Sequence, residues 1–197
     1  MKISRVITLN IILLGFINQT YAQDKRHEVE IGMGIWNTNE IINTLSDMII
    51  NSVPLGIEMK DGTSWGSIHA AYRYRLTERI GIGGLFAYDY SYEKAYLNDV
   101  RTGKFYKNHY TFAVEADYKY FAREKFSIYA LGGIGMTLYN LKYKDQNDKA
   151  RNGSDTDPYF TFQITPLGLK YGRNYGGFVE MGFGYRGVIN AGLFMCL

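Results

Sequence analysis

Ser67 and His69 stand two residues apart, which places both side chains on the same face of an extended strand. A serine hydroxyl beside a histidine is the arrangement of a nucleophile with its general base. Glu30, on the preceding apolar segment, carries a carboxylate that could orient the imidazole, as the third member of a hydrolase triad does. These three residues are therefore the candidates for an enzymatic site that cleaves an acyl bond.

Metal-ligating residue types are present but lack the spacing of a known site. The polar segment after residue 141 holds four oxygen donors for calcium, without the glycine and terminal glutamate of an EF-hand loop: Asp145, Asp148, Asp155 and Asp157. The three histidines fall on separate segments and form no zinc motif: His27, His69 and His109. We predict no metal site and interpret the aspartates as solvated loop charges.

Two further features have simple structural interpretations. Cys196 is the only cysteine, so an internal disulfide is excluded and a packing role is favoured. Gly81-Ile82-Gly83 lies within an alternating segment and opens no helix, so it is not a nucleotide-binding motif. We predict no catalytic residues and no cofactor.

The elements that would position these residues are strands. Apolar and polar residues alternate with a period of two in eight segments. The segments are residues 28–36, 67–76, 80–90, 110–120, 126–139, 159–170, 177–185 and 189–197. The connections alternate between long polar segments at 37–63, 92–107 and 142–157 and short ones at 77–79, 122–125 and 172–176, with a tight last turn around Arg186. An even number of strands with alternating loop lengths is typical of transmembrane barrels.

Two local features modify this pattern. Residues 40–53 in the first long segment have apolar residues near helical spacing, which predicts a short helix with Thr38 or Asn39 as its N-cap. Pro166 lacks a backbone N–H and therefore predicts a bulge in the sixth strand. We also predict that the last hairpin closes the barrel against the first strand.

The two faces of the strands differ in size and charge. One face carries bulky apolar and aromatic residues: Tyr72, Tyr74, Phe86, Tyr88, Phe112, Tyr118, Tyr120, Phe160, Phe162 and Phe183. The other face carries glycines and charges, which suits the narrow interior of an eight-stranded barrel. We predict that the aromatic face contacts lipid and that the interior is a salt-bridged plug. Its acids are Glu30, Asp89, Glu115, Asp117 and Glu180, and its bases are Arg73, Arg75, Lys119 and His69. The histidine then belongs to this charge network, and a soluble periplasmic barrel that binds a small apolar ligand is the alternative.

Residues 1–22 are predicted to be a cleaved signal peptide. Lys2 and Arg5 precede an apolar run that is too short to span a bilayer, and Thr20-Tyr21-Ala22 forms a small-residue cleavage site. Removing them leaves 175 residues (197 − 22), with 20 basic and 19 acidic side chains. This near-neutral balance gives no electrostatic reason for nucleic-acid binding. Residues 23–197 are predicted to form one domain.

These features together resemble the OmpA/OmpX-like family of outer-membrane barrels, which contain a porin-like β-barrel domain. The likeness is carried by the leader, the eight alternating strands and the Gly-rich closing hairpin. The last strand is similar to the family's assembly signal at Asn190, Gly192, Met195 and Leu197, although the family usually ends on an aromatic residue. The resemblance implies an eight-stranded antiparallel up-and-down transmembrane barrel, located in the cell outer membrane.

The resemblance also suggests partners and two roles. It implies contact with outer-membrane lipid, with the barrel assembly machinery through the C-terminal strand, and with an extracellular or envelope protein through the outer loops. We expect a structural or surface-interaction role, without enzymatic activity. Because some barrels of this size are lipid A-modifying enzymes with a Ser/His pair and a carboxylate, Ser67 and His69 keep a lipid A hydrolase as the alternative.

Overall fold

The computed structural model describes residues 26–41, 57–97, 100–145 and 153–197, with side chains for 26–41, 64–94, 103–144 and 153–197. Its eight strands are β1 (His27–Ile35), β2 (Ile57–Arg75), β3 (Ile80–Leu97), β4 (Val100–Ala122), β5 (Phe126–Asp145), β6 (Gly153–Gly172), β7 (Tyr175–Gly184) and β8 (Ile189–Cys196). The expected signal peptide lies outside the described residues. Among the described helical residues, none belongs to a helix long and apolar enough to cross a membrane.

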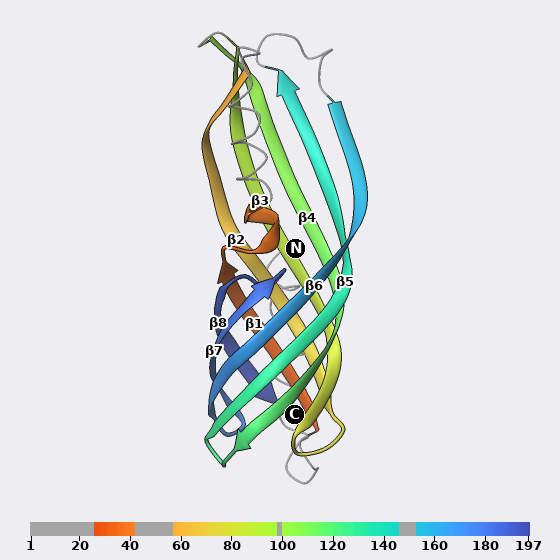
Figure 1. Ribbon diagram of the computed structural model, residues 1–197, viewed down its shortest axis with the longest axis vertical. Coiled ribbons are helices and arrows are strands. Elements are labelled where there is room, and N and C mark those ends of the chain that lie inside the picture. The colour runs from red at the N-terminus through yellow and green to blue at the C-terminus, as the bar shows by residue number, and fades with distance from the viewer. Residues whose placement is uncertain (1–25, 42–56, 98–99, 146–152) are drawn as a thin grey trace, which may run out of the picture.

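The strands form a closed antiparallel barrel in sequence order (Figure 1). Each strand pairs with its neighbour in the chain, and β8 pairs with β1 from Glu28–Cys196 to Ile35–Ile189. The predicted up-and-down topology is therefore confirmed, as is the prediction that the last hairpin closes the barrel. Closure satisfies the backbone groups that an edge strand would leave unpaired.

The two ends of the barrel differ. Three short connections, at residues 76–79, 123–125 and 173–174, lie at one end, which we call the turn end. At the other, the hairpin end, β2 to β6 continue well beyond β1, β7 and β8 (Figure 1). On β2 the pairing with β1 reaches only Ser67, and on β6 the pairing with β7 reaches only Gln163. At the hairpin end, β2 to β6 thus form a five-stranded sheet that extends past the ends of β1, β7 and β8.

This extension corrects the predicted outer loops. Residues 92–97 and 100–107 are not a loop, because β3 continues to Leu97, β4 begins at Val100, and the two strands pair through this region. Residues 142–145 and 153–157 likewise belong to β5 and β6, while residues 146–152 lie outside the described residues. Strand β2 begins at Ile57, inside the first predicted loop. The high content of Tyr, Lys and Asp in these regions leaves too few apolar residues to mark one face of a strand.

The first predicted loop begins with a helical turn at residues 38–41. Its N-cap is Asn37, and neither Thr38 nor Asn39 fills that place: the Asn37 side chain accepts from the Glu40 amide at 2.9 Å, and Glu40 accepts from the Asn37 amide at 3.1 Å. This reciprocal pair is a capping box. The rest of the predicted helix, residues 42–53, lies outside the described residues.

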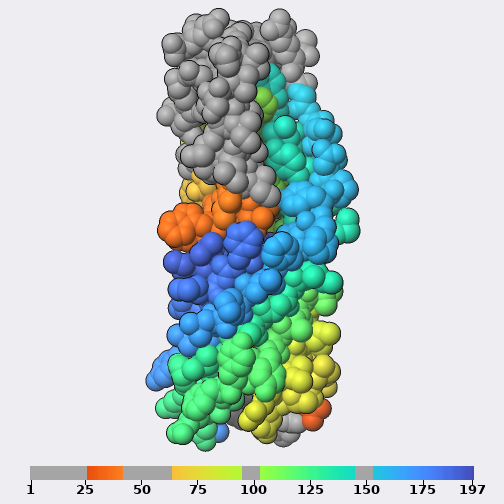
Figure 2. All heavy atoms as spheres, in the orientation of Figure 1, coloured from red at the N-terminus to blue at the C-terminus, as the bar shows by residue number. Residues whose placement is uncertain are grey.

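Burial follows the alternation of the strands. The aromatic face is exposed on the outer wall, with Phe112 at 55% and Phe160 at 68% exposure, while Glu30 is fully buried. Figure 2 shows side chains of β5 to β8 covering one side of the turn end as a continuous wall. The assignment of the aromatic residues to the outside and of the charges to the inside is confirmed.

The predicted bulge at Pro166 is also confirmed, as a register shift between Ile164 and Leu167. The extra residue reverses the alternation that follows it. Leu167, which the simple pattern placed inside, is therefore 43% exposed, and Lys170 is buried inside the barrel.

Candidate functional site: the charged lumen

The interior of the barrel holds nine charged side chains that contact one another, and we call them the lumen cluster. Its acids are Glu28, Glu30, Glu115, Asp117 and Glu180, and its bases are Arg73, Arg75, Lys170 and Arg186. They come from β1, β2, β4, β6, β7 and the β7–β8 turn. All are at least nine-tenths buried. Such charges are stable only when each one is paired and hydrogen-bonded.

Arg73 links three strands at the centre of this cluster. Its guanidinium lies 2.8 Å from Glu30 on β1, 3.3 Å from Glu115 on β4 and 3.0 Å from Asp117 on the same strand. Arg75, two residues further along β2, binds Glu28 at 3.0 Å and also contacts Asp117. The period of two keeps both arginines on the inner face.

Lys170 reaches the cluster from the opposite wall. Its ammonium group contacts both Glu28 and Glu30 on β1. It also lies 4.9 Å from the centroid of Tyr129 and 5.4 Å from that of Phe194, within the range of cation–π attraction. The pattern prediction missed this residue because the Pro166 bulge reverses its side.

Arg186 belongs to the β7–β8 turn, which folds into the lumen. Its guanidinium donates to Glu115 at 2.8 Å and to Glu180 at 3.0 and 3.1 Å, and it reaches Glu30 at 3.4 Å. Its backbone amide donates to the Gln163 side chain at 2.9 Å. A turn residue carries no periodicity, so only its isolation among apolar neighbours could have indicated a buried role.

Close backbone approach lets this turn enter the barrel. A Cβ on Gly34 would lie 1.7 Å from the carbonyl oxygen of Arg186, and Gly187 has a φ of 109°. Only glycine tolerates the first contact, and it strongly favours the second. The turn therefore depends on one glycine near the end of β1 and on one of its own.

Neutral donors complete the hydrogen bonding of the acids. The hydroxyl groups of Tyr129 and Tyr185 donate to Glu180 at 2.6 Å and to Glu115 at 3.0 Å. The Asn190 amide donates to Glu180 at 2.6 Å. Glu180 thus accepts from one cation and two neutral groups.

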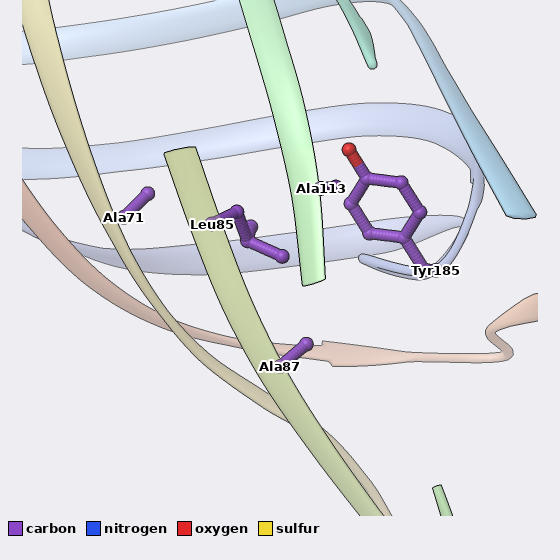
Figure 3. Close-up of a cluster of buried hydrophobic side chains, with 5 residues drawn as sticks. All are labelled: Ala71, Leu85, Ala87, Ala113 and Tyr185. Atoms are coloured by element: carbon purple, nitrogen blue, oxygen red, sulfur yellow. The ribbon is translucent and has the colours of Figure 1, made fainter. Parts of the chain in front are cut away.

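A layer of small apolar side chains covers the lumen cluster on its hairpin side. Ala71, Leu85 and Ala113 are in register on β2, β3 and β4, two residue pairs beyond Arg73 and Glu115, which is the next inward-facing position. Figure 3 shows them with Ala87 and with Tyr185, whose ring extends from the turn toward Ala113. This layer separates the charges from the polar groups above it.

A second polar layer lies at the base of the hairpin end. Asp89 accepts hydrogen bonds from Asn37 at 2.7 Å and from Asn39 at 2.8 Å. Tyr159 on β6 donates to the Asn39 side chain. The helical turn is thereby held across the barrel mouth. The prediction that Asp89 pairs with a lumen cation is wrong, because amides bind it.

The predicted hydrolase residues are close in the fold but do not form a triad. Ser67 and His69 are both buried in the lumen. Among the described residues, neither ring nitrogen of His69 has a hydrogen-bond partner. Glu30 is bound by Arg73, Lys170 and Arg186, so it does not orient the imidazole. Neither His69 nor Lys119 forms an ion pair within the described part of the chain, contrary to the predicted network.

The metal candidates also remain separate. Asp155 and Asp157 are exposed on β6, and the side chains of Asp145 and Asp148 lie outside the described set. His109 stacks on Tyr139 with ring centroids 4.9 Å apart. Within the described ranges, no group of three His, Cys, Asp or Glu side chains is placed to hold a metal ion.

The fold and the lumen define an eight-stranded antiparallel barrel with a salt-bridged, buried interior. Comparison with protein-family models finds no match, and comparison with curated proteins finds none. The resemblance to the OmpA/OmpX-like family therefore rests on the sequence features alone.

Proposed function

We propose that this protein is an outer-membrane β-barrel with a plugged lumen and a structural or surface-interaction role. The observation that carries the proposal is the reversed polarity of the barrel. Its interior holds charges and amides, while its outer wall exposes residues such as Ile134 at 63% and Leu193 at 71%. A barrel in water would leave this apolar wall exposed over a far larger area than soluble monomers tolerate.

The height of the apolar wall matches a membrane. On β4 the outward side chains from Tyr110 to Tyr120 are aromatic, apolar or alanine, and the two tyrosines are ten residues apart. Ten residues span about 33 Å along a strand, or about 25 Å along the barrel axis at a tilt of about 40°. This height equals the apolar band of outer-membrane barrels, about 25 Å.

Aromatic side chains gather at both edges of this wall, as they do at membrane interfaces. Toward the hairpin end, the exposed aromatics are Trp36, Trp65 and Tyr110, and toward the turn end they include Tyr118, Tyr120, Phe126, Tyr171 and Tyr175. By the usual orientation of such barrels, short turns face the periplasm and the hairpin end faces outward.

The lumen cluster supports a non-conducting role. Charges from six elements meet across the interior, and the small apolar layer at Ala71, Leu85 and Ala113 lies directly on them. We expect no large, steady conductance from the barrel in planar bilayers. A stable open-channel current in the wild-type protein would contradict the plug.

The role then falls to the surfaces. The outer wall contacts membrane lipid, β8 presents the assembly signal to the barrel assembly machinery, and the hairpin end presents a surface for an extracellular or envelope protein. The chain has no basic excess for nucleic acid.

Cell fractionation and gel mobility test the location. We expect the protein in the outer-membrane fraction, with a mobility that changes on heating because a closed barrel resists detergent until it is boiled. Recovery in the soluble periplasm would favour the alternative of a barrel with a small apolar ligand. Lipid A profiling of a deletion strain, complemented with wild type or His69→Ala, tests the enzyme alternative. If the deletion strain loses a lipid A modification and only the wild-type protein restores it, the enzyme alternative is supported and the non-enzymatic role is contradicted.

A further inference from the structure

The outer wall of the barrel carries an apolar groove that crosses β2, β3, β4 and β5. Its volume is about 720 Å³, within the range of small-molecule sites, roughly 300–1,000 Å³. The groove lies between two outward-facing rows of the backbone register, one from Tyr72 to Ile134 and the other from Ala70 to Met136. The bulky side chains of both rows are 41–63% exposed, so the chain itself leaves the groove open.

Gly84 lies within the first of these rows, and the backbone does not explain why this residue is a glycine. Its φ is not positive, and its pairing with Tyr72 and Val114 continues without a register shift. Beyond its chain neighbours, a Cβ here would have one atom within 4 Å, the Ala113 carbonyl oxygen at 3.8 Å. A glycine inside a strand weakens the strand and often marks a place where a ligand approaches the backbone. The groove is therefore space that a side chain could fill but does not.

The lining of the groove is apolar except at one end. Among the described side chains that line it, only Tyr72 has an oxygen or nitrogen atom. The Tyr72 hydroxyl is hydrogen-bonded to a ring nitrogen of His27 at 2.6 Å, and His27 is the exposed first residue of β1, at the turn end. Tyrosine takes this place where an apolar surface meets a wet edge. The groove thus has an apolar length and a polar end, as a lipid has an acyl chain and a headgroup.

The groove rises from the turn end toward the middle of the membrane wall. Tyr72 is three residues from the end of β2 (75 − 72), whereas Ile134 is eight residues from the start of β5 (134 − 126). Val114, in the same row, lies near the middle of the apolar segment that Tyr110 and Tyr120 bound on β4. A chain in the groove therefore runs from the membrane interface at the turn end into the hydrocarbon.

The dimensions of the groove fit a single hydrocarbon chain. Four adjacent strands span about 14 Å at about 4.8 Å per spacing. The hydrocarbon of one leaflet is about 15 Å thick, half of a core of about 30 Å. Successive outward rows are about 7 Å apart along a strand, so a chain midway between them has carbon contacts of about 3.5 Å on both sides. An extended peptide does not suit this site, because its backbone groups would lack hydrogen-bond partners there.

We propose that this groove binds one acyl chain of a lipid from the leaflet at the turn end. The headgroup lies beside Tyr72 and His27, and the end of the chain lies near Ile134. Because lipid tails already surround the wall, close packing in the groove favours binding, and exclusion from water does not. This inference rests on the proposed membrane insertion and deepens it, because it assigns one lipid to a fixed place on the wall.

The experiment measures photolabelling of the refolded protein in phosphatidylcholine vesicles. The probe is a trace of phosphatidylethanolamine with a diazirine at the end of one acyl chain, and labelled residues are identified by peptide mass spectrometry. Ile134 is compared with Ile164 and Ile35, which are exposed outside the groove and are also eight residues from the turn end of their strands (172 − 164 and 35 − 27). We expect the label on Ile134 to exceed that on the other two about fivefold in the wild type.

Filling the groove should remove this preference. Gly84→Leu should lower the labelling of Ile134 about fivefold, because a filled groove packs no closer than bulk lipid does. Gly132→Leu is the matched control, since it adds the same side chain to open space on the wall outside the groove, and it should leave the labelling unchanged. If Gly84→Leu does not insert, Ala70→Leu narrows the same groove, with Ala191→Leu on the exposed face of β8 as its control.

Three results would overturn the inference. They are even labelling of the three isoleucines in the wild type, unchanged labelling in both groove variants, and a cross-linked pair of barrels that Gly84→Leu separates, which would assign the groove to a second copy of the chain. Heat-dependent gel mobility checks insertion of every protein. A wild type that inserts and is labelled evenly refutes this inference alone, whereas a wild type that does not insert refutes the membrane proposal as well.

Discussion

Replacing Arg186 by methionine should destabilise the barrel strongly. The side chain is fully buried and contacts three carboxylates, on Glu30, Glu115 and Glu180. Without it, Glu115 retains Arg73 at 3.3 Å, but Glu180 keeps only the neutral donors of Tyr129 and Asn190. Removing one partner of a buried ion pair costs about 3–5 kcal/mol, because the remaining charge stays desolvated. We expect Arg186→Met to lower the free energy of unfolding by this amount.

The assay is urea unfolding in phosphatidylcholine vesicles, followed by tryptophan fluorescence. Trp36 and Trp65 are the only tryptophans, and both are exposed on the outer wall, so their emission reports contact with lipid. Arg173→Met at an exposed turn is the matched control and should change stability by less than about 0.5 kcal/mol. If Arg186→Met prevents folding, Arg186→Lys keeps the charge and gives an intermediate loss.

A double-mutant cycle separates the ion pair from simple loss of packing. Glu180→Gln removes the carboxylate charge, and its single amide oxygen can keep one of the two hydrogen bonds, because Tyr129 and Asn190 donate to different oxygens of Glu180. In the Arg186→Met background it should restore part of the lost stability, with a coupling of about 1–3 kcal/mol. If Arg186→Met behaves like the Arg173 control, or if the two substitutions are additive, the buried network is not what holds the turn inside the barrel.

Three further predictions address the other closures of the barrel. Gly34→Ala should expel the β7–β8 turn from the lumen, because the new Cβ would lie 1.7 Å from the carbonyl oxygen of Arg186. Limited proteolysis should then cut the turn. Gly132→Ala is the control, because its new Cβ would meet nothing within 4 Å. Asn37→Ala should lose about 1 kcal/mol of helix-cap stability in addition to its hydrogen bond to Asp89, seen as faster amide exchange in the first helical turn. Thr38→Ala should cause no such loss, because its hydroxyl has no partner among the described residues. Deleting residues 190–197 should leave β1 unpaired and abolish the heat-dependent mobility shift; a truncated protein that still shows the shift would contradict the closing role of β8.

The fold could be predicted largely from the alternation of side chains, because a period of two with one bulky face leaves few alternatives. Glu30, Arg73 and Glu115 were assigned to the lumen for the same reason, and the structure confirms them. The strand ends were less predictable. Beyond Tyr92 most residues are polar or aromatic and few are apolar, so the chemical contrast that marks a strand weakens although the pairing continues.

The lumen contacts that the sequence pattern did not predict lie where the alternation of the strands is interrupted or ends. Lys170 follows a bulge that shifts every later residue to the opposite face, and the size of that shift depends on pairing with β7. Arg186 lies in a turn, where no repeat says whether a side chain enters the barrel or solvent. Asp89 was expected to need a cation, but two amides from a distant segment satisfy it. Each of these contacts is set by tertiary structure.

Cys196 pairs with Glu28 where β1 and β8 close the barrel, so the reactivity of its thiol reports when the barrel closes. The thiol is the only one in the chain, and in the closed barrel it is half-buried beside the Glu28 carboxylate, with its sulfur 3.9 Å from a carboxylate oxygen. Before the seam forms, the last strand is open to solvent and the thiol reacts at the rate of an exposed cysteine. Pulse labelling with a maleimide during refolding would therefore give the time at which β8 pairs with β1, without an engineered cysteine. The labelling rate should fall at the same time as the gel mobility changes, because both measurements report closure of the barrel.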